Sequence, residues 1–230
     1  MTGRTFVLGD IHGAFRALEQ CLNRCDFNPE YDHLVALGDV CDGWPQVREC
    51  IEFLLKIPNL TYILGNHDYW ALSWFRNQVP PDLWLNQGGQ ATLNSYADGV
   101  PLSHRQFLEQ AKLYHLTTDH RLFVHAGIMP DKPLMEQDES IFLWDRSLFN
   151  LACRLKMHHE EKSLGSYKEI YIGHSPTIRA GYPVPLQSGN VWMMDTGAAW
   201  DGHLTIMDIE SKAYFQSDRV ADLYPGVKGR

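Results

Sequence analysis

The chain has 230 residues, of which 44% are hydrophobic and 21% are charged, and its formal net charge is −8. This composition predicts a globular protein that forms its core without disulfides or a structural metal. The acidic balance argues against a nucleic-acid partner, and no apolar run approaches the length of a membrane-spanning helix. The five cysteines include no CxxC pair and no long apolar leader precedes the first strand pattern, so we expect a cytoplasmic protein that does not contact the membrane.

Strand and helix patterns alternate through the first third of the chain. Strands are expected at residues 4–8, 33–37 and 60–64, and helices at 14–25, 46–57 and 68–77. This alternation predicts an α/β fold with layered helices and sheets.

The second part of the chain is less regular, and we expect one domain over 1–230 with a helical, loop-rich insertion at about 79–120. A helical pattern occupies 105–114 within it, and 138–162 is expected to be mostly helical or irregular. Strands are expected at 121–124, 169–172, 191–194 and 204–209. The HHEEK stretch at 158–162 is interpreted as a solvated face, and PGVKGR at 225–230 is expected to be frayed.

A polar cluster directly follows each of five predicted strands. These clusters are GDIHG (9–13), GDVCDG (38–43), GNHD (65–68), HAG (125–127) and GHS (173–175). Ligands gather at the carboxyl ends of the strands in open α/β sheets, so we expect the clusters to converge. Imidazole nitrogens and carboxylate oxygens together suit one or two divalent ions such as manganese, iron or zinc.

Each cluster also has a purely structural interpretation. GDVCDG is a typical glycine and aspartate turn, and GNHD is typical of the start of a helix. The ordered set favours a metal site over five independent structural features. In the extended DxH segment, Asp10 and His12 can point to the same side, and the short carboxylate of Asp39 can bridge two ions.

In this order the motifs resemble those of the calcineurin-like metallophosphoesterases, and more closely the bacterial and phage branch of the phosphoprotein phosphatase superfamily. The resemblance spans residues 9–174 and implies a four-layer αββα sandwich with two divalent ions, manganese being favoured over iron or zinc. It also implies the metal ligands, which would be Asp10 and His12 on the first ion, Asp39 on both, and Asn66, His125 and His174 on the second.

The resemblance further implies a catalytic pair, His67 with Asp42 as its partner. A hydroxide bridging the two ions would attack phosphorus, and His67 would donate a proton to the leaving oxygen. Asn66 and His67 would also contact the phosphate, and Asp68 is expected to cap the following helix. Arg146 in LWDR resembles the phosphate-binding arginine of the family, with a surface ion pair as the alternative.

The chain departs from the family pattern at Gly43, where DRG is common and an arginine would help to bind phosphate. Arg48, Arg16 and Arg179 are possible substitutes. The tryptophans at 70, 74 and 84 could stack on a nucleobase or pack in the core, and the sequence leaves both open.

The motif set predicts a serine/threonine protein phosphatase, with a phosphorylated protein or a small phosphoester as its partner. The alternative is a hydrolase of dinucleoside polyphosphates such as diadenosine tetraphosphate, because HAGI and GNHD also resemble the symmetrical tetraphosphatases. A nuclease or phosphodiesterase is disfavoured by the lack of a basic tract, and a non-catalytic scaffold by the retention of all six ligands. Oligomeric state is left open.

Overall fold

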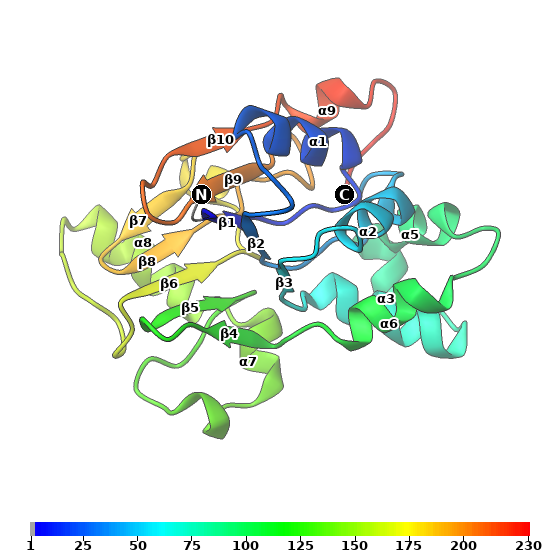
Figure 1. Ribbon diagram of the computed structural model, residues 1–230. Coiled ribbons are helices and arrows are strands. Elements are labelled where there is room, and N and C mark those ends of the chain that lie inside the picture. The colour runs from blue at the N-terminus through cyan, green and yellow to red at the C-terminus, as the bar shows by residue number, and fades with distance from the viewer. Residues whose placement is uncertain (1–2) are drawn as a thin grey trace.

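The computed structural model describes residues 3–230, which form two five-stranded sheets (Figure 1). The first has the order β10-β9-β1-β2-β3 and the second has the order β4-β5-β6-β8-β7. The first sheet comprises β1 (Thr5–Leu8), β2 (His33–Ala36), β3 (Leu60–Tyr62), β9 (Thr205–Asp208) and β10 (Tyr214–Gln216). The second comprises β4 (Tyr114–Leu116), β5 (Arg121–Val124), β6 (Glu169–Ile172), β7 (Leu186–Ser188) and β8 (Val191–Met193).

The alternation of side chains along the strands produces three hydrophobic layers. In β1, Val7 points toward the second sheet, where it shares a buried cluster with Phe123 and Tyr171. Its neighbours Phe6 and Leu8 point the other way, into a cluster formed with helices. Successive side chains of a strand face opposite sides, so both faces of the central strands are buried and these strands are nearly continuous apolar runs.

Helices cover the outer face of each sheet, which confirms the predicted αββα sandwich (Figure 1). On the first sheet lie α1 (Phe15–Arg24) and α2 (Val47–Leu54), with α3 (Asn66–Asn77) beyond them. On the second lie α7 (Glu139–Trp144) and α8 (Ser147–Met157). The short α9 (Val220–Leu223) follows the last strand.

Residues 79–120 add a largely helical segment beside α3. It contains α4 (Asp82–Trp84), the π-helical turn η1 (Leu85–Gly89), α5 (Gln90–Ser95) and α6 (Leu102–Glu109). Gly89 permits the buried Trp84 ring to lie against the backbone, because a Cβ at Gly89 would be 2.6 Å from that ring. The predicted helix at 105–114 is wrong at its end, since Tyr114 starts β4 and pairs with Val124.

The sequence patterns missed three strands, β4, β7 and β10, which all lie at sheet edges. Each has three residues and pairs antiparallel with a single neighbour. Each pairs with the strand next to it along the chain, but none has the continuous buried apolar run that reveals the central strands.

The prediction that 225–230 frays was wrong for its last two residues. Gly229 packs on the indole of Trp44, since a Cβ there would be 2.7 Å from Cζ2, and the N–H of Arg230 donates to the carbonyl of Ala199 at 2.9 Å. Figure 1 accordingly marks the end of the chain beside α1 and α2.

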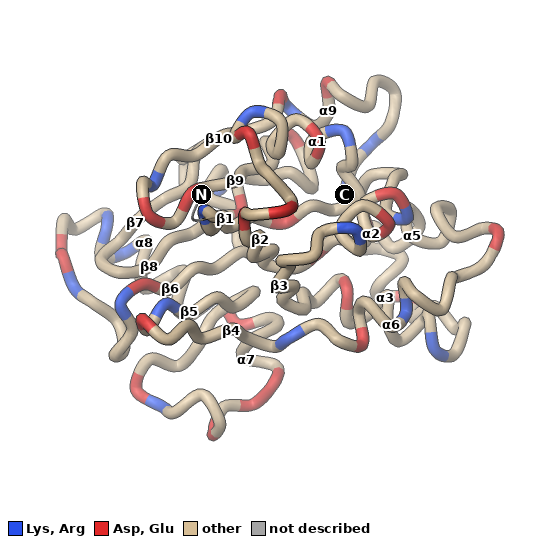
Figure 2. The backbone as a smooth tube through the Cα atoms, viewed as in Figure 1, with Lys and Arg blue, Asp and Glu red and all other residues tan. Residues whose placement is uncertain are grey.

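Charge is distributed over the whole chain, with acidic and basic positions interspersed (Figure 2). Within residues 3–230, no helix is long and apolar enough to cross a bilayer. All five cysteines are free thiols, and four of them are buried.

Candidate active site

The six predicted metal ligands come from segments that directly follow five strands. Strands β1, β2 and β3 are parallel, as are β5 and β6, so the residues that follow them share one edge of each sheet. All six side chains are buried, and they are Asp10, His12, Asp39, Asn66, His125 and His174.

Asp39 belongs to both groups of potential metal ligands that the described residues contain. One group is Asp10, His12 and Asp39, and the other is Asp39, His125 and His174; within each group the ligand atoms lie within 4.8 Å of one another. Asp39 Oδ2 is 3.6 Å from His12 Nε2 and 3.4 Å from His125 Nε2. Asn66 joins the second group, with Oδ1 at 3.1 Å from His125 Nε2.

The backbone is strained at four predicted site residues. His12, Asp39, Asp42 and His174 have φ values of 49°, 51°, 73° and 62°, in the left-handed region that side chains with a Cβ rarely adopt. The Asp39 carbonyl accepts the N–H groups of Ile11 and His12 at 3.1 and 2.8 Å, which holds the two loops together. Such strain is typical of sites where side chains must be aimed at a ligand.

Carbonyl oxygens orient the ligand imidazoles. His125 Nδ1 lies 2.7 Å from the Leu37 carbonyl, and His12 Nδ1 lies 3.0 Å from the Cys41 carbonyl. A carbonyl can only accept, so each Nδ1 carries a hydrogen, which leaves Nε2 as the atom that binds a metal when the ring is neutral.

Burial and charge act against each other on these groups. Burial raises the pKa of Asp39, but the neighbouring histidines, His125 foremost, outweigh it and hold the pKa well below the usual range. Burial lowers the pKa of His125, yet Asp39 and Asp10 raise it to about 10. Burial, followed by the charge of Asp195, raises the pKa of Asp10, while burial lowers that of His12 to about 3.

The donor set fits two divalent ions that share Asp39. His174 Nε2 is buried without a hydrogen-bond partner among residues 3–230, which is costly unless a ligand completes it. Carboxylate, amide and imidazole donors together match the preferences of divalent transition metals.

His67 and Asp42 form a buried pair next to these ligands. His67 Nδ1 is 2.5 Å from Asp42 Oδ2, and His67 Nε2 has no hydrogen-bond partner among the residues described. Asp42 also accepts from Trp84 Nε1 at 2.7 Å and from Thr92 Oγ1 at 2.6 Å. The 79–120 segment therefore fixes the carboxylate that orients His67.

The three tryptophans have structural contacts. Trp84 is fully buried and donates to Asp42, and Trp74 is 7% exposed with its ring 5.8 Å from that of Trp84. Trp70 packs edge-on against His67, with ring centroids 5.2 Å apart. Core packing therefore accounts for Trp74 and Trp84, rather than stacking on a base.

Asp68 does more than cap α3. It accepts the N–H of Gly65 at 3.0 Å, which confirms the predicted cap, and also the N–H groups of Asp39 at 2.8 Å and Cys41 at 3.1 Å. The Tyr62 hydroxyl donates to the same carboxylate at 2.7 Å. One side chain thus ties the loop that carries Asp39 to the start of α3, which carries Asn66 and His67.

Asp195 is a site residue that the sequence reasoning missed. It is buried, accepts the N–H of Gly197 at 2.9 Å, and has its pKa raised to about 6 by burial. It follows β8 closely, so its position after a predicted strand was the signal that could have identified it.

Three arginines line a cavity of about 430 Å³ beside the ligand segments. Its lining comprises Asn86, Gln87, Arg146, Pro176, Arg179, Trp200 and Arg230. Pro176 follows the ligand His174 by two residues. Among residues 3–230, Arg146 makes no ion pair with a carboxylate, so the surface-pair alternative fails.

Two suggested substitutes for the missing arginine are engaged elsewhere. Arg48 donates to the carbonyls of Ser95 and Gly99, and Arg16 donates to the carbonyl of Leu223.

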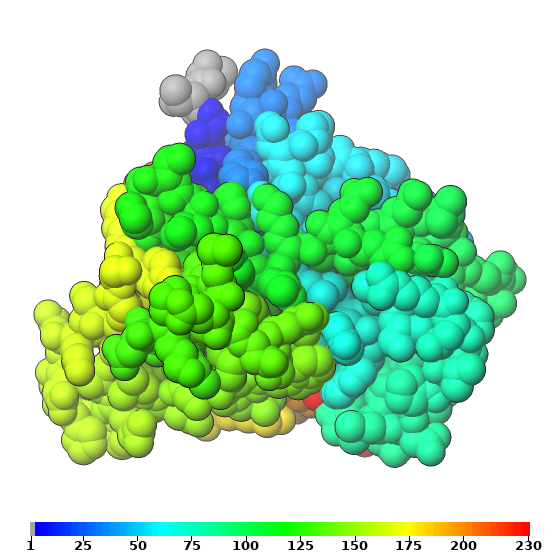
Figure 3. Space-filling model, turned by 90° about the horizontal axis from the view of Figure 1, so that it is seen from below, coloured from blue at the N-terminus to red at the C-terminus, as the bar shows by residue number. Residues whose placement is uncertain are grey.

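Figure 3 shows a notch in the molecular surface. Atoms of the α3–α4 region, in cyan to teal, lie on one side of it, and yellow-green atoms from the middle of the chain lie on the other. Red atoms from the last part of the chain are visible within it.

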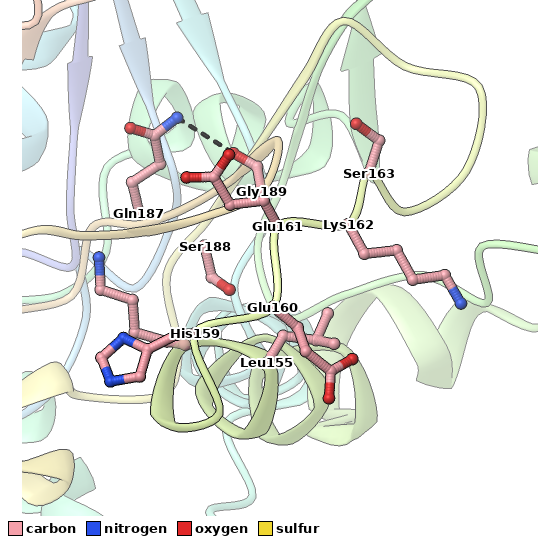
Figure 4. Close-up of a pocket in the computed structure, with 10 residues that line it drawn as sticks. Leu155, His159, Glu160, Glu161, Lys162, Ser163, Gln187, Ser188 and Gly189 are labelled. Atoms are coloured by element: carbon pink, nitrogen blue, oxygen red, sulfur yellow. Dashed lines mark hydrogen bonds between the residues drawn. The ribbon is translucent and has the colours of Figure 1, made fainter.

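A second cavity, of about 520 Å³, lies between the end of α8 and the loop at Gly189 (Figure 4). His159, Glu160 and Lys162 of the HHEEK stretch line it, and this stretch is exposed, as predicted. None of the predicted site residues lines this cavity.

Two packed sheets with groups of aspartate and histidine ligands at their strand ends are the architecture of a metal-dependent hydrolase. The family model "Calcineurin-like phosphoesterase" matches residues 3–200, and the chain belongs to this family. It is therefore a metal-dependent phosphoesterase.

Curated relatives fall into two groups. "Serine/threonine-protein phosphatase 1" of Salmonella typhimurium is 29% identical over 89% of this chain and 91% of its own length. "Bis(5'-nucleosyl)-tetraphosphatase, symmetrical" of Haemophilus ducreyi is 25% identical over 94% of this chain and 99% of its own length, and relatives of the same name from other bacteria match similarly. A solved protein serine/threonine phosphatase from Saccharomyces cerevisiae has the same fold, with a TM-score of 0.63 at 14% identity over 99% of this chain and 82% of that one.

We expect Asp39→Asn to remove bound metal, because the neutral amide lacks the negative charge that Asp39 contributes to both ligand groups. Elemental analysis of protein loaded with Mn²⁺ measures this, and the metal content should fall from about two ions per chain to below about one. Asp131→Asn, on the exposed surface, is the control and should keep its metal. Full metal retention by Asp39→Asn would refute the shared-ligand arrangement.

Asp68→Asn should weaken metal binding by about 10- to 100-fold, the usual effect of losing a group that orients a ligand. The side-chain oxygen of asparagine can still accept a hydrogen bond, but it lacks the negative charge that strengthens the bonds from the backbone N–H groups of Asp39 and Cys41. Titration with Mn²⁺ measures the affinity. An unchanged affinity, with a lowered melting temperature only, would limit Asp68 to capping the helix.

Proposed function

We propose that the chain hydrolyses symmetrical dinucleoside polyphosphates, with diadenosine tetraphosphate as the representative substrate. The observation that carries this proposal is the cavity lined by Arg146, Arg179 and Arg230 beside the ligand segments. A chain of linked phosphates carries several negative charges, and planar guanidinium groups are the side chains best suited to bind them. The tetraphosphatase relatives, which match nearly the whole chain, support the same substrate class.

A serine/threonine protein phosphatase is the second candidate. It was the function that the motifs alone predicted, and the 29% identity to the Salmonella phosphatase favours it. The departure at Gly43 weakens the likeness to the DRG-containing protein phosphatases. Both candidates share the same metal and proton-transfer groups and differ in what occupies the arginine-lined cavity.

In this proposal six side chains hold two divalent ions, with manganese as the expected metal. They are Asp10 and His12 on one side, Asn66, His125 and His174 on the other, and Asp39 shared between them. When bound, such ions supply Lewis-acid chemistry, polarising phosphoryl oxygens and lowering the pKa of water. Asp68 supports the loop of Asp39, and neither Asp68 nor Asp195 belongs to either ligand group.

His67 acts as the general acid in the proposed mechanism. Because Asp42 engages Nδ1, the unpartnered Nε2 is the atom that can carry a proton to the leaving oxygen. Asp42 keeps the ring in this orientation, and its own geometry is held by Trp84 and Thr92. Asn66 and Arg146 are proposed to contact the phosphate together with His67.

A location in the cytoplasm and a single domain over 1–230, with its insertion at 79–120, remain predictions. The free thiols are compatible with a reducing compartment. Phosphoesters are the expected partners, and the net charge of −8, with basic positions interspersed among acidic ones along the backbone (Figure 2), disfavours nucleic acid.

A substrate panel separates the two candidate functions. With Mn²⁺ present, we expect kcat/KM for diadenosine tetraphosphate to exceed that for phosphoserine and phosphothreonine peptides by at least about tenfold, equivalent to about 1.4 kcal/mol. Adenosine diphosphate as the only nucleotide product would identify symmetrical cleavage. Preference for the phosphopeptides would overturn the proposal in favour of the protein phosphatase.

His67→Asn should keep its metal and lose turnover by about 10²- to 10⁴-fold, because the general acid is removed while the ligands remain. The loss should be largest for esters with poor leaving groups, which need a proton most. Steady-state kinetics with an aryl and an alkyl phosphate, together with elemental analysis, measure both effects. Parallel loss of metal and activity would contradict the assignment.

A further inference from the structure

The turn at Gly43 cannot simply carry the arginine that is common in the family. Gly43 has a φ of 81°, and a Cβ there would lie 3.1 Å from the Cβ of His12 and 3.2 Å from its carbonyl oxygen. Any other residue would be strained and crowded against a predicted metal ligand. A positive group on this side of the site must therefore come from another part of the chain.

The side chain of Arg230 reaches this side of the site. A Cβ on Gly88 would be 3.3 Å from Arg230 Cγ, so the arginine stem runs alongside Gly88. The carbonyl of Gly88 in turn accepts the N–H of Gly43 at 3.3 Å. Gly88 therefore contacts both Gly43, where the arginine is missing, and Arg230.

Two neighbours position the guanidinium of Arg230. Its Nη2 donates to Gln87 Oε1 at 2.6 Å, and its Cζ lies 5.1 Å from the centroid of the Trp200 ring. Arg179 lies over the same ring at 4.6 Å, so Trp200 supports two guanidinium groups by cation–π contact. The backbone of Arg230 is anchored to Ala199, next to Trp200.

The charge of Arg230 is not neutralised by any carboxylate of the site. Burial lowers its pKa, and the charges of Asp39, Asp42 and Asp195 act in the opposite direction. Within residues 3–230, its guanidinium makes no ion pair and no hydrogen bond besides that to Gln87. Its remaining N–H groups are available to an anion in the cavity that it lines.

We propose that Arg230 is a substrate-binding residue that grips the phosphate group in place of the arginine absent at position 43, with Gln87 and Trp200 as its positioning residues. The proposal rests on the phosphoesterase class of the protein and not on the choice of dinucleotide or phosphopeptide. In the family pattern the arginine follows the aspartate at position 42, whereas Arg230 comes from the segment after α9. Packing of that segment on Trp44 brings Arg230 to the site.

The test compares Arg230→Ala and Arg230→Lys with Lys228→Ala, an exposed cation two residues away that does not line the arginine cavity. Hydrolysis of p-nitrophenyl phosphate by the Mn²⁺-loaded full chain is measured together with inhibition by inorganic phosphate. We expect Arg230→Ala to lose about 10- to 100-fold in kcat/KM and to raise the phosphate inhibition constant by about tenfold or more, as for loss of a charge-assisted contact. Arg230→Lys should lose less, and Lys228→Ala less than about twofold.

Metal content and melting temperature separate loss of the contact from loss of structure. Added guanidinium should partly restore Arg230→Ala, an effect that a purely structural role would not produce. Calorimetric binding of inorganic phosphate gives a readout that needs no turnover. If Arg230→Ala keeps its metal and binds phosphate within about twofold of the parent chain, the proposal is overturned, whereas inactivity toward diadenosine tetraphosphate alone would overturn only the proposed substrate.

Discussion

The candidate site depends on one buried carboxylate, that of Asp39, which belongs to both groups of potential metal ligands among the described residues. Removing an anion from water is costly unless positive or hydrogen-bonding groups surround it, and His12, His125 and the amide of His67 do so. Its backbone is held in a left-handed conformation by the loop on which it lies. The parallel order of the strands is what allows loops from both sheets to meet at this residue.

Support for the site comes from segments far apart in the sequence. Trp84 and Thr92 of the 79–120 segment hold Asp42, which in turn orients His67. Arg230 brings a cation to the same region from the last part of the chain. These segments lie outside the predicted ligand set, so a substitution in them can alter the surroundings of the site and leave the ligands in place.

The sequence patterns located the central strands of both sheets, because strands buried on both faces are nearly continuous apolar runs. The sequence patterns predicted the ends of the elements and the edge strands less well. The helix predicted over 105–114 ends at Glu109, since Tyr114 pairs with β5 instead. In that case antiparallel pairing with the next strand along the chain outweighs the local helical pattern.

By itself, the sequence determined the residue types after each strand and their order, and these indicate the α/β fold, the class of chemistry and the candidate ligands. A side chain that follows a parallel strand has little choice of where to point, so local reasoning suffices for Asp10, Asp39 and His125. Only the tertiary structure decided that Asp68 ties the loop of Asp39 to α3, that the charge of Asp195 acts on Asp10, and that Gly88 contacts both Gly43 and Arg230. These contacts join residues whose separation along the chain carries no periodic signal, so packing alone creates them.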